Sequence, residues 1–110
     1  MTTNILDVER LKQTADDAGR LLKALANTDR LLLLCQLSQD ELCVQDLEER
    51  LDIHQPTLSQ QLGVLRTEGL VETRREGKRI YYRVASEEAL AVVRTLYDLY
   101  CRGGGRRTRK

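Results

Sequence analysis

The spacing of apolar residues predicts amphipathic helices at both ends of the chain. The first stripe steps by three or four residues, which places its members on one helix face; they are Val8, Leu11, Ala15, Ala18, Leu22 and Leu25. This spacing is close to a heptad seam, so the helix suits packing on a partner helix as well as on its own core. Ser86 can cap the last helix, whose stripe runs through Ala89, Val93, Leu96 and Tyr100 to about Cys101.

The stretch between residues 27 and 37 is predicted to be a buried helix. Asn27 can cap it, because its side chain can accept a hydrogen bond from an early helical N–H. The segment Thr28–Leu37 contains five leucines and is apolar all round, which is typical of a helix enclosed by its neighbours. Cys35 lies within it and is expected to be largely buried.

Two short helices are predicted next, joined by a four-residue link. The first covers about residues 44–51 and the second about residues 56–68. Pro56 suits a first helical turn, where its missing N–H is not needed, and Gly69 supplies the stop. Gly63 is unfavourable inside a helix by about 1 kcal/mol relative to alanine, and we expect it to permit the close approach of another helix. The buried faces are Val44, Leu47 and Leu51, and Leu58, Leu62 and Leu65.

The pattern then becomes strand-like. Two runs rich in β-branched or aromatic residues, 70–75 and 79–84, flank a short turn that contains Gly77, which is typical of a β-hairpin. A pair of short helices followed directly by a hairpin forms a winged helix-turn-helix. The predicted fold is therefore mainly α, with about five helices and a β-hairpin wing.

Length and composition indicate one small, highly charged globular domain. The chain has 110 residues, of which 41% are hydrophobic and 32% charged. We assign residues 1–101 to this domain and residues 102–110 to a glycine-rich basic tail, which is expected to be disordered. No apolar run approaches the about 20 residues that span a bilayer, so no membrane association is expected. The N-terminus shows no secretion signal, and we expect a cytoplasmic protein with reduced thiols.

The net charge of +1 hides an asymmetry that points to nucleic acid. Residues 1–52 carry 6 basic and 11 acidic side chains, whereas residues 53–110 carry 12 and 6, which favours an anionic partner for one face. The second motif helix presents amides and hydroxyls suited to base edges. The end of that helix and the hairpin present cations suited to phosphates. The only histidine, His54, is interpreted as a turn residue. The candidate contacts to double-stranded DNA are Gln55, Thr57, Ser59, Gln60, Gln61, Arg66, Arg74, Arg75, Lys78 and Arg79.

Four short segments together resemble the ArsR/SmtB family of dimeric winged-helix repressors. They are residues 41–47 (ELCVQDL), 55–62 (QPTLSQQL), 68–71 (EGLV) and 77–82 (GKRIYY). The resemblance extends over about residues 8–101. It implies a homodimer that forms through the first and last helices, with two recognition helices that read a palindromic operator.

Two cysteines resemble those of the persulfide-sensing branch of this family: Cys35 follows Leu-Leu, and Cys101 follows Leu-Tyr. The resemblance implies that reactive sulfur species join the two thiols through extra sulfur atoms and relieve repression of sulfide-handling genes. A thiolate can attack an electrophilic sulfur to give a persulfide, which a second thiol then resolves. A plain disulfide needs Cα atoms within about 7 Å, whereas inserted sulfur atoms allow a wider gap.

Cys43 allows other interpretations of the signal that the protein senses. It holds a position where serine would cap a helix, so we interpret it first as a variant cap and second as an accessory thiol or metal ligand. One metal class of the family has a Cys-x-Cys pair here, but Gln45 takes the second place, and a four-ligand zinc site is not expected. An arsenite- or metal-responsive repressor that uses Cys43 is one alternative. A constitutive antirepressor with inert cysteines is another. No cofactor motif is found, and an enzyme is not expected.

Overall fold

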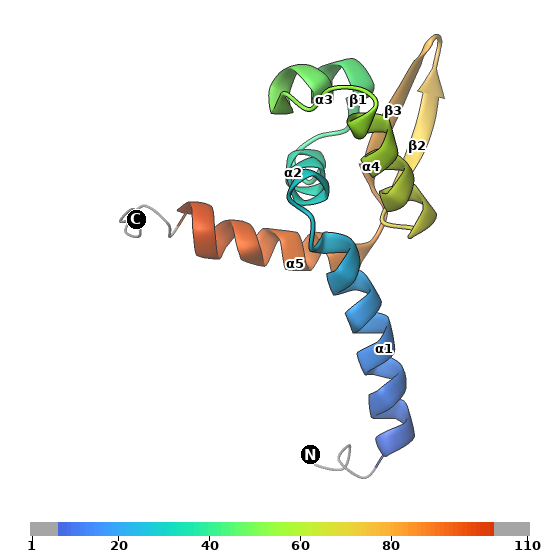
Figure 1. Cartoon of the computed structure of the whole chain (residues 1–110), viewed down its shortest axis with the longest axis vertical. Coiled ribbons are helices and arrows are strands. Elements are labelled where there is room, and N and C mark those ends of the chain that lie inside the picture. Colours follow the sequence, from blue (N-terminus) through green and yellow to red (C-terminus); the bar gives the residue numbers. More distant parts are fainter. Residues whose placement is uncertain (1–6, 103–110) are drawn as a thin grey trace.

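The computed structural model describes residues 7–102 and has the winged helix-turn-helix architecture (Figure 1). Its elements are α1 (Val8–Leu25), α2 (Thr28–Leu37), β1 (Leu42–Cys43), α3 (Val44–Leu51), α4 (Thr57–Thr67), β2 (Val71–Glu76), β3 (Arg79–Val84), α5 (Glu87–Tyr97) and a π-helical turn, η2 (Asp98–Arg102). The predicted tail lies outside the described residues from residue 103 onward. None of the helices among residues 7–102 is long and apolar enough to cross a membrane.

Helix α2 lies at the centre of the fold. It contacts α1, α3, α4, α5 and β3, which explains why its sequence is apolar on nearly every side. Each leucine taken out of water contributes about 1.5–3 kcal/mol to the free energy of folding. The leucines that are essentially inaccessible to solvent come from the three helices predicted to pack here: Leu33, Leu34, Leu47, Leu58, Leu62 and Leu65.

Local capping residues set the starts of α2 and α5 as predicted. The Asn27 side chain accepts a hydrogen bond from the Arg30 N–H at 3.0 Å, and Ser86 Oγ accepts one from Ala89 N–H at 3.0 Å. The expectation for Cys43 is corrected in part. Cys43 does occupy the N-cap position of α3, but its side chain makes no capping bond to the backbone.

The wing is a tight antiparallel hairpin. Strands β2 and β3 pair from Val71 opposite Val84 to Glu76 opposite Arg79, and Gly77 adopts the left-handed φ of 65° that this turn requires. A third strand, β1, was not predicted and pairs with β3, so that the sheet order is β1-β3-β2. Two residues are too short to produce an alternating pattern. This strand joins the start of α3 to the wing.

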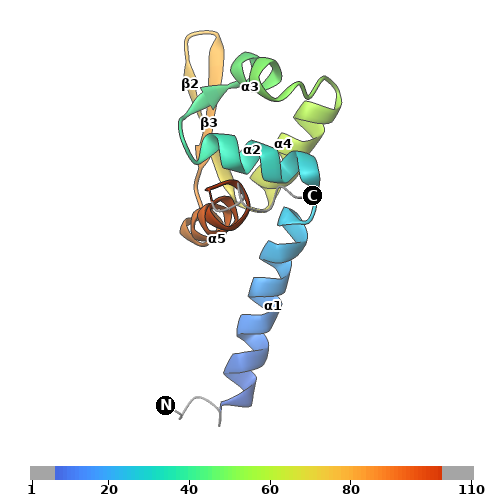
Figure 2. The same cartoon turned by 90° about the vertical axis from the view of Figure 1, so that its left-hand side faces the viewer.

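Helices α1 and α5 extend from this body in different directions (Figures 1 and 2). Much of the apolar stripe of α1 is open to solvent, with Leu11 61% and Leu22 56% exposed. The end of the last helix is similar, with Leu99 58% and Tyr100 61% exposed. Large apolar side chains exposed together on two elements indicate a protein interaction surface.

The role predicted for Gly63 is wrong. This glycine is exposed, and a Cβ atom added to it would meet no atom within 4 Å. No other helix of the described chain approaches α4 at this point. The face of α4 that carries Gly63 is therefore an open surface.

Candidate DNA-binding surface and thiol pair

The link between α3 and α4 fixes the start of the second motif helix. Asp52 ends α3 in the left-handed region at φ 57°. The Leu58 N–H then donates to the His54 carbonyl at 3.0 Å, and the Ser59 N–H donates to Gln55 Oε1 at 3.0 Å. Gln55, predicted as a DNA contact, therefore uses its side-chain oxygen to cap α4. Its side-chain amide nitrogen remains available to donate a hydrogen bond to DNA.

The polar residues of α4 divide into two groups. Ser59 and Gln60 are exposed, and Thr57 is half-buried at the first turn. Gln61 is also half-buried, and its Oε1 accepts a hydrogen bond from Arg30 of α2 at 2.8 Å. The structure therefore brings Ser59 and Gln60 to the surface beside Thr57 and directs Gln61 toward α2.

Arg74 is held by acidic partners within the protein. Its Nε lies 2.9 Å from Glu41 Oε2, its second terminal nitrogen donates to Glu41 Oε1 at 3.0 Å, and its first contacts Glu76 at 2.8 Å. The guanidinium also lies 4.9 Å from the centre of the Tyr81 ring. Bonding to Arg74 lowers the pKa of Glu41. Arg74 thus joins β2 to the segment before β1.

The other residues predicted to contact phosphates are exposed to solvent. Arg66, Arg75 and Lys78 are exposed, and none of them forms an ion pair with another residue in the described part of the chain. They are the cations of α4 and the wing that are free to meet phosphates. Arg79 is exposed too, but its guanidinium also reaches the sulfur of Cys43 at 3.8 Å.

Cys43 is completely buried where β1, α3 and the wing meet. Its thiol donates to Asp46 Oδ2 at 3.3 Å, and Arg79 approaches it from β3. The sulfur of Cys43, followed by Tyr81, raises the pKa of Arg79. Cys43 therefore packs as a small core residue with two polar partners.

Cys35 and Cys101 lie on different elements but within electrostatic range of each other. Cys35 is half-buried on α2, which corrects the expectation that it is largely enclosed, and Cys101 is exposed in η2. Burial raises the pKa of the Cys35 thiol, and the charge of Cys101 raises it further. Helix α2 packs against α5, whose continuation carries Cys101. Cys35 is therefore within electrostatic range of Cys101 and only partly shielded from solvent.

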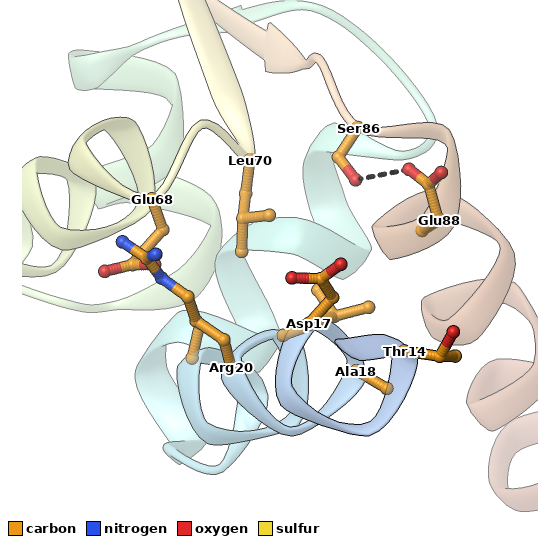
Figure 3. A pocket seen from close by; sticks show the side chains of 10 residues that line it. Thr14, Asp17, Ala18, Arg20, Glu68, Leu70, Ser86 and Glu88 are labelled. Atoms are coloured by element: carbon orange, nitrogen blue, oxygen red, sulfur yellow. Dashed lines mark hydrogen bonds and ion pairs between the residues drawn. The ribbon is translucent and has the colours of Figure 1, made fainter. Parts of the chain in front are cut away.

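The described residues contain no group of three or more His, Cys, Asp or Glu side chains that could hold a metal ion. A hollow of about 600 Å³ lies between α1, the end of α4 and the start of α5. Its lining includes Asp17, Arg20, Glu68 and Glu88 (Figure 3). No cysteine lines it.

His54 lies in the link between α3 and α4, where its imidazole ring contacts two carboxylates. Its Nε2 lies 2.7 Å from Asp52 Oδ1, and its Nδ1 lies 3.4 Å from Glu48 Oε2. Bonding to Glu48, followed by the charge of Asp52, raises the pKa of His54. This confirms His54 as a turn residue.

Known proteins resemble this chain in both sequence and architecture. Residues 27–73 match the model of the bacterial regulatory protein arsR family. The Biofilm growth-associated repressor of Agrobacterium fabrum is 50% identical over 91 residues, which make up 83% of this chain and 78% of that repressor.

Two solved structures extend the comparison. Reduced HlyU from Vibrio cholerae matches with a TM-score of 0.81 at 42% identity, over 84% of this chain and 98% of HlyU. The homodimeric winged helix-turn-helix DNA-binding domain Mb0332 from Mycobacterium bovis matches with a TM-score of 0.70 at 37% identity, over 82% of this chain and 83% of that domain. The chain therefore belongs to the arsR family of bacterial regulatory proteins, as a DNA-binding transcriptional repressor rather than an enzyme.

Proposed function

We propose that this repressor binds its operator while Cys35 and Cys101 are reduced and is released when persulfides or polysulfides bridge them, so that it controls sulfide-detoxification genes in the cytoplasm. The observation that carries the proposal is that the charge of Cys101, on the continuation of α5, contributes to the raised pKa of Cys35 on the central helix, which puts the two thiols within electrostatic range of each other. That a solved relative is described as reduced HlyU supports a redox-dependent state in this family.

The thiol environments suggest an order of events. The raised pKa of Cys35 lowers its thiolate fraction, and half-burial limits access to it. The exposed Cys101 therefore reacts first: its thiolate attacks the outer sulfur of a low-molecular-weight persulfide, becomes a persulfide, and releases the donor as a thiol. Cys35 is converted in the same way by a second donor.

The bridge then forms without any other oxidant. The terminal sulfur of the Cys101 persulfide attacks the inner sulfur of the Cys35 persulfide, whose S–S bond breaks and expels hydrosulfide. The product is a three-sulfur link between the two side chains. The oxidising equivalents come from the sulfane sulfur of the donors.

A bridge between α2 and η2 would act on DNA binding through the contacts of α2. Helix α2 packs on both α4 and α5, so a new covalent link changes how the recognition helix sits relative to the last helix. The exposed apolar faces of α1 and of the end of the last helix favour a homodimer through these elements. The homodimeric state of the Mycobacterium bovis domain supports the same arrangement. In such a dimer the bridge alters the spacing of the two recognition helices.

Intact-mass analysis after treatment with glutathione persulfide tests the chemistry. We expect a species heavier by one sulfur atom and lighter by two hydrogens, with the bridge mapped by peptide sequencing to Cys35 and Cys101. Cys43→Ser is the matched control and should give the same species. A bridge that includes Cys43, or persulfides that never cross-link, would contradict the proposal.

A further inference from the structure

The Arg30 side chain joins three helices that have separate tasks. Its Nε donates to the Ala24 carbonyl at 2.6 Å, and one terminal nitrogen lies 3.4 Å from the Lys23 carbonyl. The other terminal nitrogen donates to Gln61 Oε1 at 2.8 Å. Arg30 lies in the first turn of α2. Its side chain reaches the end of α1 on one side and the recognition helix α4 on the other.

These bonds restrict the position of the end of α1 and the orientation of the Gln61 side chain. The last carbonyls of a helix have no partner within it, and the guanidinium satisfies that of Ala24 at the end of α1 and adds a second, longer contact to that of Lys23, which also accepts from the Ala26 N–H. Its planar fork presents donors in a fixed geometry, so that the nitrogen left for Gln61 has a set direction. Arg30 and Gln61 are both half-buried, which makes a charge-assisted bond stronger than it is in water.

We propose that Arg30 is a positioning residue for sequence reading: through Gln61 it fixes the rotation of α4, and with it the direction of Ser59 and Gln60. Gln61 is then an anchor rather than a base-reading residue. Hydrogen bonds to base edges need donor–acceptor distances near 2.7–3.2 Å, so a small rotation of α4 breaks them. Ionic contacts from the wing to phosphates tolerate such a rotation. Loss of the bond between Arg30 and Gln61 should therefore remove the preference for the operator over other DNA, while the affinity for DNA of any sequence is retained.

A second bond between α1 and α4 supplies a matched control. Arg20 Nε lies 2.8 Å from Glu68 Oε1, and the two side chains meet at the edge of the hollow (Figure 3). The Arg20 side chain is 72% exposed, and exposed pairs of this kind contribute little. Glu68 also follows the last residue of α4 and lies far along the helix from Ser59. Loss of this pair should leave sequence reading unchanged.

The test is a double-mutant cycle on the reduced protein. The DNA is an operator that the wild type selects from random duplexes, compared with an unselected duplex of equal length. We expect Arg30→Met and Gln61→Met each to lower operator affinity about tenfold, the usual scale of one base contact. Affinity for the unselected duplex should change less than about twofold, because phosphate contacts carry it. The double variant should be no weaker than the weaker single variant, since both remove the same bond.

Two results would overturn the proposal. Losses that add to about a hundredfold in the double variant would mean that Gln61 reads a base independently of Arg30. A parallel fall in affinity for both duplexes, or an equal loss of preference in Arg20→Met, would mean general disruption. Should Arg30→Met not fold, Arg30→Lys takes its place in the cycle with the same expectations, because its single ammonium cannot hold the α1 carbonyls and Gln61 together.

Discussion

Cys35 on α2 lies within electrostatic range of Cys101 in η2, and the charge of Cys101 raises the pKa of Cys35 beyond the effect of burial alone. The ionisation of Cys35 is therefore sensitive to a thiol on a different element. We predict that iodoacetamide modifies Cys101 well before Cys35 at neutral pH, because the raised pKa lowers the thiolate fraction of Cys35 and its thiol is half-buried, whereas Cys101 is exposed. In a Cys101→Ser variant, the Cys35 reaction should move to lower pH, since one of the two causes of its raised pKa is gone. Timed alkylation with peptide mass spectrometry measures both rates. Faster modification of Cys35, or no change in the variant, would contradict this relationship.

The wing cations should differ in their effect on the salt dependence of DNA binding. Arg75 and Lys78 are exposed, whereas Arg74 is bound to Glu41 and Glu76. Each of Arg75→Ala and Lys78→Ala should reduce the slope of log affinity against log salt by about 0.9. Arg74→Ala should leave the slope nearly unchanged and lower thermal stability. An equal drop in slope for Arg74→Ala would show that its intramolecular pairs open on DNA.

His54 should give the link before α4 a pH-dependent stability. Its pKa is raised in the folded state by Glu48 and Asp52. The stabilisation is therefore fully present below the ordinary pKa of about 6.5 and is lost as pH rises through the folded value. The free energy of unfolding of wild type minus that of His54→Asn should fall across this window. A difference that is flat with pH, or that grows as pH rises, would contradict the contacts of His54.

Gly63 and Gly69 should respond in opposite ways to alanine. Gly63 is helical and has open space around its Cα, whereas Gly69 has a φ of 75°. Gly63→Ala should raise the free energy of unfolding by about 1 kcal/mol, and Gly69→Ala should lower it by about 1 kcal/mol or more because alanine is strained there. Urea denaturation measures both. A Gly63→Ala variant that is less stable than wild type would mean that this face of α4 is covered, as in a second copy.

Short-range patterns made most of the fold predictable. The spacing of Leu58, Leu62 and Leu65, and the caps Asn27 and Ser86, depend only on residues within a few positions of each other. Strand β1 was missed because two residues carry no periodicity. The bonds that refine the site were also missed, because Arg74 lies 33 residues from Glu41 and Arg30 lies 31 from Gln61. Nothing local to either arginine distinguishes a partner inside the protein from a phosphate outside it.

The central claim is that a bridge between Cys35 and Cys101 weakens operator binding. The most direct measurement is the dissociation constant for the operator by fluorescence anisotropy, before and after glutathione persulfide and with dithiothreitol to reverse the bridge. We predict that the bridged wild type and Cys43→Ser bind at least about tenfold more weakly than their reduced forms, a usual scale for coupling between two sites. Cys35→Ser and Cys101→Ser should not respond. A fully bridged wild type that binds the operator as tightly as the reduced protein would contradict the account.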